Sequence, residues 1–175
     1  MTTAPSTTTA PSSGPPSPTD RPSAPPVETP APSPTLSIAS RCTGNAEQQD
    51  FFAAVAEAVT WDVYCPALPA GWFVDAGMYR LRDGGWLEIR YTGPANATLE
   101  LREGAYCRDE GCVPPGTEAG EAAFADRPGT LVALDDGGFA IVVDRGAQIG
   151  WLAVGRGIGR ERFVDIASAL ELVPA

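Results

Sequence analysis

The composition of the chain changes abruptly after residue 40, and this change limits what the chain can fold into. Residues 1–40 hold 11 Pro, 16 Ser or Thr and no aromatic residue. Such a segment cannot bury enough apolar surface to offset the entropy lost on ordering. We therefore predict a disordered, extended Pro/Ser/Thr-rich stalk over residues 1–40 and one folded domain over residues 41–175. A ligand for proline-binding modules is the alternative interpretation of the Pro-rich tract.

The charged residues exclude several kinds of chemistry. All 12 basic residues are Arg, because the sequence has neither Lys nor His. The chain therefore has no His general base, no His metal ligand, no Schiff-base Lys and no phosphate-loop Lys. The net charge of −10 also makes nucleic acid and anionic lipid poor partners, because their binding depends on neutralising phosphates.

Two segments carry the apolar spacing of helices. The first covers residues 46–59, where Asn45 and Gln48 have the spacing of an N-cap and its capping-box partner. The second covers residues 160–170, with Gly159 as the expected N-cap. In both segments apolar residues recur three and four positions apart, which predicts one buried face per helix.

Between these helices the apolar period changes to two, which is typical of half-buried strands. Turns rich in Asp and Gly separate the segments, and such short links join antiparallel neighbours. We predict strands over residues 74–81, 86–91, 98–102, 121–125, 130–134, 139–144 and 149–154. The predicted fold class is α+β: two layers, with an antiparallel meander sheet of six to seven strands flanked by an N-terminal and a C-terminal helix.

The four cysteines are the most specific feature of the domain. We favour a disulfide between Cys107 and Cys112, which closes a short loop, and one between Cys42 and Cys65, which staples the two ends of the first helix. Each would contribute about 2–4 kcal/mol, and both indicate an oxidising, extracytoplasmic compartment. Free structural thiols and a metal site are the alternatives, although Cys42 and Cys65 lack the close spacing of a zinc pair.

The sequence predicts no catalytic, cofactor-binding or metal-binding set. Ser168 is the one Ser of the domain, and no His is present to activate it. The Asp135–Gly137 run lacks the ligand spacing of a calcium loop, and the Gly155–Gly159 run lacks the full spacing of a phosphate loop. Most acidic residues lie in turns or on polar strand faces, which indicates solvated surface rather than paired catalytic carboxylates.

Trp86 marks the candidate ligand or partner surface. It shares a strand face with Glu88 and Arg90, which are both charged. An exposed aromatic side chain on such a face is typical of a binding surface. Packing in the core or at its rim is the other interpretation of Trp86, and the usual burial of Trp favours it; Trp151 is expected in the core.

Two stretches of the domain resemble a known kind of bacterial domain. The first runs from Leu68-Pro69-Ala70-Gly71-Trp72 to Leu99-Glu100-Leu101. The second runs from Gly120-Glu121-Ala122-Ala123-Phe124 through Gly129-Thr130-Leu131 and Ile149-Gly150-Trp151 to Ile166-Ala167-Ser168-Ala169-Leu170. Together they resemble the opening and the ending of small extracytoplasmic domains of unknown function, of actinobacterial type. Such domains occur in lipoproteins and after the membrane helix of anti-sigma-factor-like proteins. The resemblance implies no catalytic residues, and the four cysteines are not part of its pattern.

These observations favour a non-enzymatic extracytoplasmic sensing or binding domain, tethered by a Pro-rich stalk and without a cofactor. Its expected partner is an unknown protein or an apolar small molecule, with no nucleic acid, and the chain is expected to be a monomer. No apolar run is long enough to span a membrane, so we expect an anchor or signal to have preceded Met1; a complete protein with a disordered leader is the alternative. A carrier of a lipid or other apolar ligand and a carboxylate-dependent hydrolase of cell-wall sugar are the alternative functions.

Overall fold

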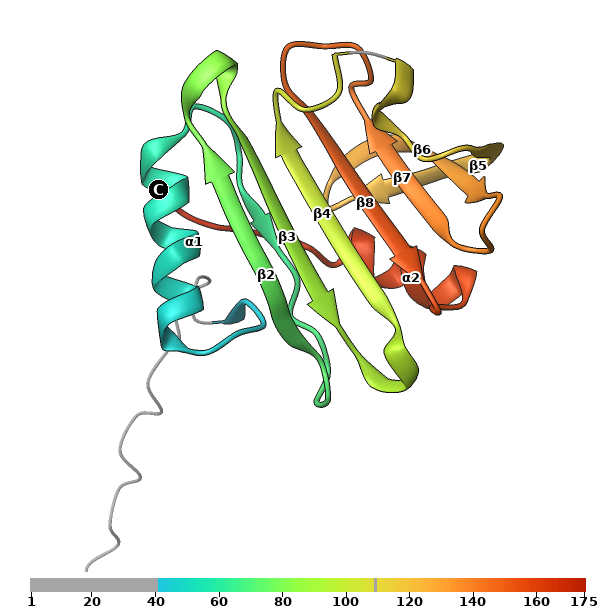
Figure 1. Cartoon of the computed structure of the whole chain (residues 1–175), viewed down its shortest axis with the longest axis horizontal. Helices are drawn as coiled ribbons and strands as arrows, with labels where there is room; N and C mark the ends of the chain where they lie inside the picture. The colour runs from blue at the N-terminus through green and yellow to red at the C-terminus, as the bar shows by residue number, and fades with distance from the viewer. Residues whose placement is uncertain (1–40, 109) are drawn as a thin grey trace, which may run out of the picture. The chain divides into compact units, whose positions relative to one another are not determined.

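The computed structural model describes residues 41–175 with the exception of residue 109, and it has the predicted α+β class (Figure 1). The disordered stalk predicted for residues 1–40 lies outside the described residues. The helices are α1 (Ala46–Ala58) and α2 (Arg160–Ser168). The main sheet contains β2 (Phe73–Arg80), β3 (Trp86–Thr92), β4 (Thr98–Gly104), β5 (Gly116–Phe124), β6 (Arg127–Leu134), β7 (Phe139–Val143) and β8 (Gly150–Arg156). A separate two-stranded sheet pairs β1 (Tyr64–Cys65) with β9 (Glu171–Leu172).

The main sheet is antiparallel throughout, but its strand order is not that of one meander. The order is β2-β3-β4-β8-β7-β6-β5, so two meanders meet where β4 pairs with β8. After β4 the chain crosses to the far edge of the sheet and then returns strand by strand. The reason lies in the connection 105–115, which is too long for a hairpin and contains the Cys107–Cys112 loop.

Both helices begin where the sequence predicts. The Gln48 N–H donates to Asn45 Oδ1 at 3.0 Å, and the Asn45 N–H donates to Gln48 Oε1 at 2.8 Å, which completes the capping box of α1. Gly159 is the N-cap of α2. The helices end one or two residues before the predicted ends, within the usual uncertainty of such boundaries.

The main core lies on one face of the sheet, called the inner face here, and both helices pack on that side (Figure 1). Phe52 and Val55 of α1 and Phe163 of α2 are completely buried against the inward side chains of the strands. Trp151 belongs to this core, as predicted, and only 5% of it is exposed. The strands contribute inward residues at alternate positions, for example Leu87, Ile89 and Tyr91 of β3.

A second, smaller core lies on the opposite face, called the outer face, and only over part of the sheet. Cys107 and Val113 of the connection 105–115 pack there against six outward side chains of β6, β7 and β8. These six are Val132, Leu134, Ala140, Val142, Leu152 and Val154. The connection is hydrogen-bonded at both ends, from the Gly146 N–H to Cys107 O and from the Asp135 N–H to Pro115 O, each at 3.0 Å.

The two predicted disulfide pairs are confirmed. Cys42 is bonded to Cys65 and Cys107 to Cys112, with Cα atoms 5.4 and 4.9 Å apart. Among the described residues all four thiols are therefore used, and the metal alternative is wrong for them. Two disulfides suggest an oxidising, extracytoplasmic environment. Neither helix in the described part of the chain has the length and hydropathy to cross a membrane.

Candidate functional site

The outer face is open over β2, β3 and β4, and this region contains the residues that the sequence singled out. Across the three strands Met78, Glu88 and Arg102 lie side by side, and Ala76, Arg90 and Glu100 form the next row. Trp86 lies in the row beyond Glu88. We call this surface the open face, with the outward residues Phe73, Ala76, Met78, Arg80, Trp86, Glu88, Arg90, Thr92, Thr98, Glu100 and Arg102.

The open face contains a small slot beside Trp86. It has a volume of about 120 Å³ and is lined by Trp86, Leu87, Glu88, Arg102 and Tyr106. The structure therefore brings Trp86 and Glu88 together as predicted, with Trp86 half-buried. Arg90 does not line the slot, although its Nη2 atom lies 3.9 Å from Glu88 Oε1.

Tyr106 reaches the slot because the chain turns sharply at the end of β4. Gly104 has a φ of +95°, a conformation that residues with a side chain rarely adopt. A Cβ atom at this position would lie only 2.7 Å from Gly85 O and 2.8 Å from the ring of Trp61. Glycine is therefore required where the chain leaves the sheet, and the turn brings Tyr106 back towards Trp86.

The charged side chains of the open face are held by one another. Arg102 Nε lies 3.2 Å from Glu88 Oε2 and 2.5 Å from Glu100 Oε1. The carboxylates are half-buried, with 22% of the Glu88 side chain and 15% of the Glu100 side chain exposed. Partial burial strengthens such pairs relative to free surface pairs and fixes their orientation. The result is a rigid set of donors and acceptors beside an aromatic ring.

Two polar atoms at the slot lack a hydrogen-bond partner. They are Arg102 Nε, which is close to two carboxylates without the alignment of a hydrogen bond, and the Tyr106 hydroxyl. Burial raises the pKa of Tyr106 above its ordinary range, so the hydroxyl keeps its proton at neutral pH. Buried polar groups are normally paired with protein or water, so the Tyr106 hydroxyl is the atom where a water or a ligand would be stabilised, whereas Arg102 Nε already faces two carboxylates.

Exposed apolar side chains gather along β2, at the border of the open face. Phe73, Met78, Tyr79 and Leu81 are 44–56% exposed, and they are four of the five large apolar residues that are exposed in the described part of the chain. Phe73 and Met78 face the open side, while Tyr79 points to the inner side and contacts Phe51 at a centroid distance of 5.6 Å. Such a concentration of apolar surface is typical of an interaction site.

Both edges of the main sheet are interrupted. The pairing of β2 with β3 skips Asp75, and the pairing of β5 with β6 skips Ala119. The carbonyl of Ala119 also accepts a hydrogen bond from Arg160 Nη2 at 2.9 Å. Bulges at sheet edges oppose the addition of another strand. Binding is therefore expected on the open face rather than along a sheet edge.

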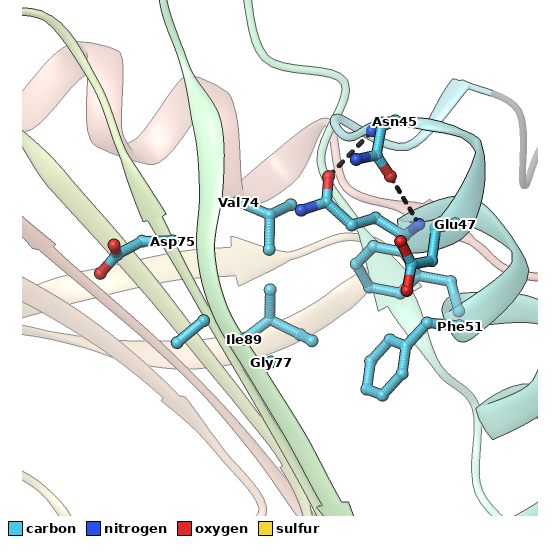
Figure 2. A pocket seen from close by; sticks show the side chains of 10 residues that line it. Asn45, Glu47, Phe51, Val74, Asp75, Gly77 and Ile89 are labelled. Carbon is cyan, nitrogen blue, oxygen red and sulfur yellow. Dashed lines mark hydrogen bonds between the residues drawn. The ribbon is translucent and has the colours of Figure 1, made fainter.

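A second hollow lies between α1 and β2 on the inner side. Figure 2 shows Phe51, Val74 and Ile89 around this groove, with Glu47 at its border. Its volume is about 280 Å³. Space exists because residue 77 is a glycine, whose added Cβ would lie 3.1 Å from Ile89 Cδ1. The Asp75 carboxylate points away from the groove, so the walls that remain are mainly apolar (Figure 2).

One buried carboxylate, Glu103, was missed by the sequence prediction. It is completely buried, and both of its oxygens accept the backbone N–H of Tyr64 at 3.1 Å. Burial raises the pKa of Glu103 well above its ordinary range, while the Tyr64 N–H and Arg127 lower it in part. The predicted strand ended at Arg102; one more residue would have placed Glu103 on the buried side with Leu101.

Arg127 joins the surroundings of Glu103 into one structural cluster. Its guanidinium lies 4.0 Å from the ring centroid of Trp151, and its Nε donates to the Tyr64 hydroxyl at 3.1 Å. Its Nη2 forms an ion pair with Asp62, whose carbonyl accepts the Trp151 Nε1–H at 3.0 Å. These contacts hold β1 to the main sheet. Glu103 is the one buried acid in the described part of the chain, so the cluster contains no pair of buried carboxylates.

No family model, no curated protein and no solved structure matches this chain. The resemblance to bacterial extracytoplasmic domains therefore stays a prediction.

Proposed function

We propose that the domain is a non-enzymatic, extracytoplasmic sensing or binding domain, tethered through its Pro-rich segment, as in the bacterial lipoproteins that it resembles. The observation that carries this proposal is the open face: a half-buried Trp86, an ordered set of ion pairs and exposed apolar side chains lie together. Trp, Met and Arg are the residue types enriched at interaction surfaces.

The chemistry of the open face favours binding over catalysis. Glu88 and Glu100 both form ion pairs with Arg102, which fixes the positions of their carboxylates on the open face. Such groups recognise a partner through hydrogen bonds whose geometry exists before binding.

A site-specific photo-crosslinking experiment tests this function. A benzophenone side chain is placed at Met78 on the open face and, as a matched control, at Leu172 on β9, which has a similar exposure (51% and 46%). In cells that produce the protein, we expect adducts at position 78 and few at position 172. Equal crosslinking at both positions, or none at position 78, would contradict the proposed function.

The groove between α1 and β2 favours the alternative function of a carrier for an apolar ligand. Its volume of about 280 Å³ is near the lower limit of ligand sites. Native mass spectrometry of the protein from an oxidising compartment would show the ligand as added mass. A Gly77→Leu variant fills the groove and should lose that mass; an unliganded wild-type protein would exclude the carrier.

A further inference from the structure

We propose that the slot beside Trp86 binds a neutral saccharide, with the rows of polar side chains on the open face contacting further sugar units. This inference rests on the proposed binding function and gives the chemical class of the ligand.

The first argument is the charge of the open face. The basic residues Arg80, Arg90 and Arg102 are balanced by Glu88 and Glu100 of the open face and by Asp83, which forms an ion pair with Arg80 at 2.7 Å, so 3 basic and 3 acidic residues give no net charge. The whole chain has a net charge of −10. A locally neutral surface on an acidic protein gives no advantage to a cation or an anion, so a neutral ligand fits it best.

The second argument is the kind of polar group at the slot. The Tyr106 hydroxyl lacks a hydrogen-bond partner, and the Glu88 carboxylate also lines the slot. Sugar hydroxyls both donate and accept, so one ring can satisfy a donor and a carboxylate at the same time. The Trp86 ring offers an apolar surface for the C–H groups of a sugar.

The third argument is size. Three strands spaced about 4.8 Å apart, with seven residues of about 3.4 Å each, give a face of roughly 300 Å². A stable protein partner usually covers about 800 Å² on each side, so the open face alone is small for one. A short oligosaccharide needs less area, and the slot of about 120 Å³ accommodates one part of a sugar unit.

Saturation-transfer NMR on the oxidised, full-length chain tests the proposal. The probes are N,N′-diacetylchitobiose, cellobiose and maltose, each at millimolar concentration. We expect transfer to at least one of them, with an affinity about tenfold weaker in Trp86→Ala. Tyr106→Phe removes one hydroxyl and should weaken binding by about three- to tenfold. Arg162→Gln, an exposed change on α2, is the control and should bind like the wild type.

The outcomes separate this proposal from the proposed function. If no probe receives saturation, or if transfer persists unchanged in Trp86→Ala, the saccharide proposal is wrong. Crosslinks at position 78 would then still support a binding domain with another ligand. Loss of the folded amide spectrum in Trp86→Ala would move the test to Trp86→Phe and Tyr106→Phe, where unchanged affinity in both would overturn the proposal.

Discussion

The two halves of the outer face differ in the polarity of their outward side chains and in whether another segment covers them. Over β6, β7 and β8 the outward side chains are apolar, and the connection 105–115 covers them. Over β2, β3 and β4 the outward side chains are mostly charged or polar and stay accessible. The burial patterns of the strands show the difference directly: β8 is buried at nearly every position, whereas β3 alternates. An uncovered region that contains Trp86 is therefore a property of the sequence of β3 and β4.

The largest expected effect comes from placing a charged side chain on the covered half, and the matched variant places an apolar side chain on the open half. Leu152 and Arg102 are cross-strand partners on either side of the boundary, and Leu152 is completely buried. Leu152→Arg puts an unpaired charge beneath the connection 105–115 and should lower the free energy of unfolding by more than about 4 kcal/mol. Arg102→Leu on the open side should change it by about 1 kcal/mol. Urea unfolding measures both; similar costs would show that the halves do not differ as described.

Removal of the Cys107–Cys112 disulfide should affect mainly the connection 105–115 and the strands beneath it. In the chain-entropy description, loss of Cys42–Cys65 costs about 3 kcal/mol and loss of Cys107–Cys112 about 2 kcal/mol, because the second loop is shorter. Amide hydrogen exchange of the Cys107→Ala/Cys112→Ala variant should increase in β7 and β8 and remain unchanged in β3. Faster exchange spread evenly over the sheet would contradict a local role of this bond.

Glu103 makes the stability depend on pH. Its pKa is raised in the folded state, so the related stability is fully present below the unfolded pKa of about 4.3 and is lost as pH rises through the folded pKa. The slope can reach about 1.4 kcal/mol per pH unit over that interval. Glu103→Gln should flatten this decline when unfolding is followed from pH 4 to pH 8. An unchanged profile would show that Glu103 does not cause it.

The smallest expected effect concerns the slot. Tyr106→Phe removes a buried hydroxyl that has no hydrogen-bond partner, so it should leave stability unchanged or raise it by about 0.5–1 kcal/mol. Thermal unfolding monitored by circular dichroism measures the change. A loss of more than about 1 kcal/mol would show that the hydroxyl has a stabilising partner in solution.

The sequence predicted the local structure well because the signals were local. The capping box at Asn45, the apolar spacing of both helices and the Asp-Gly turns each act over a few residues. The disulfide pairs were favoured because one closes a short loop and the other joins the two ends of the first helix. The order of the strands did not follow, because nothing in the connection 105–115 indicates which edge of the sheet the chain will reach next.

The candidate site was predicted in part for the same reason. Trp86, Glu88 and Arg90 share a strand, so alternation alone placed them on one face. Arg102 belongs to the next strand, and only the register of the hairpin shows that it lies beside Glu88. Tyr106 follows the turn at Gly104, where no periodic pattern remains.

Hydroxyl-radical footprinting tests the central claim most directly, by comparing the protein in its native setting with the purified domain. We expect a partner on the open face and none at Leu172 of β9, although Met78 and Leu172 are exposed to a similar extent. We predict that Met78 and Trp86 are protected in the native setting, while Leu172 is modified equally in both samples. Equal modification of Met78 and Trp86 in both samples would contradict the account, because the open face would then have no partner.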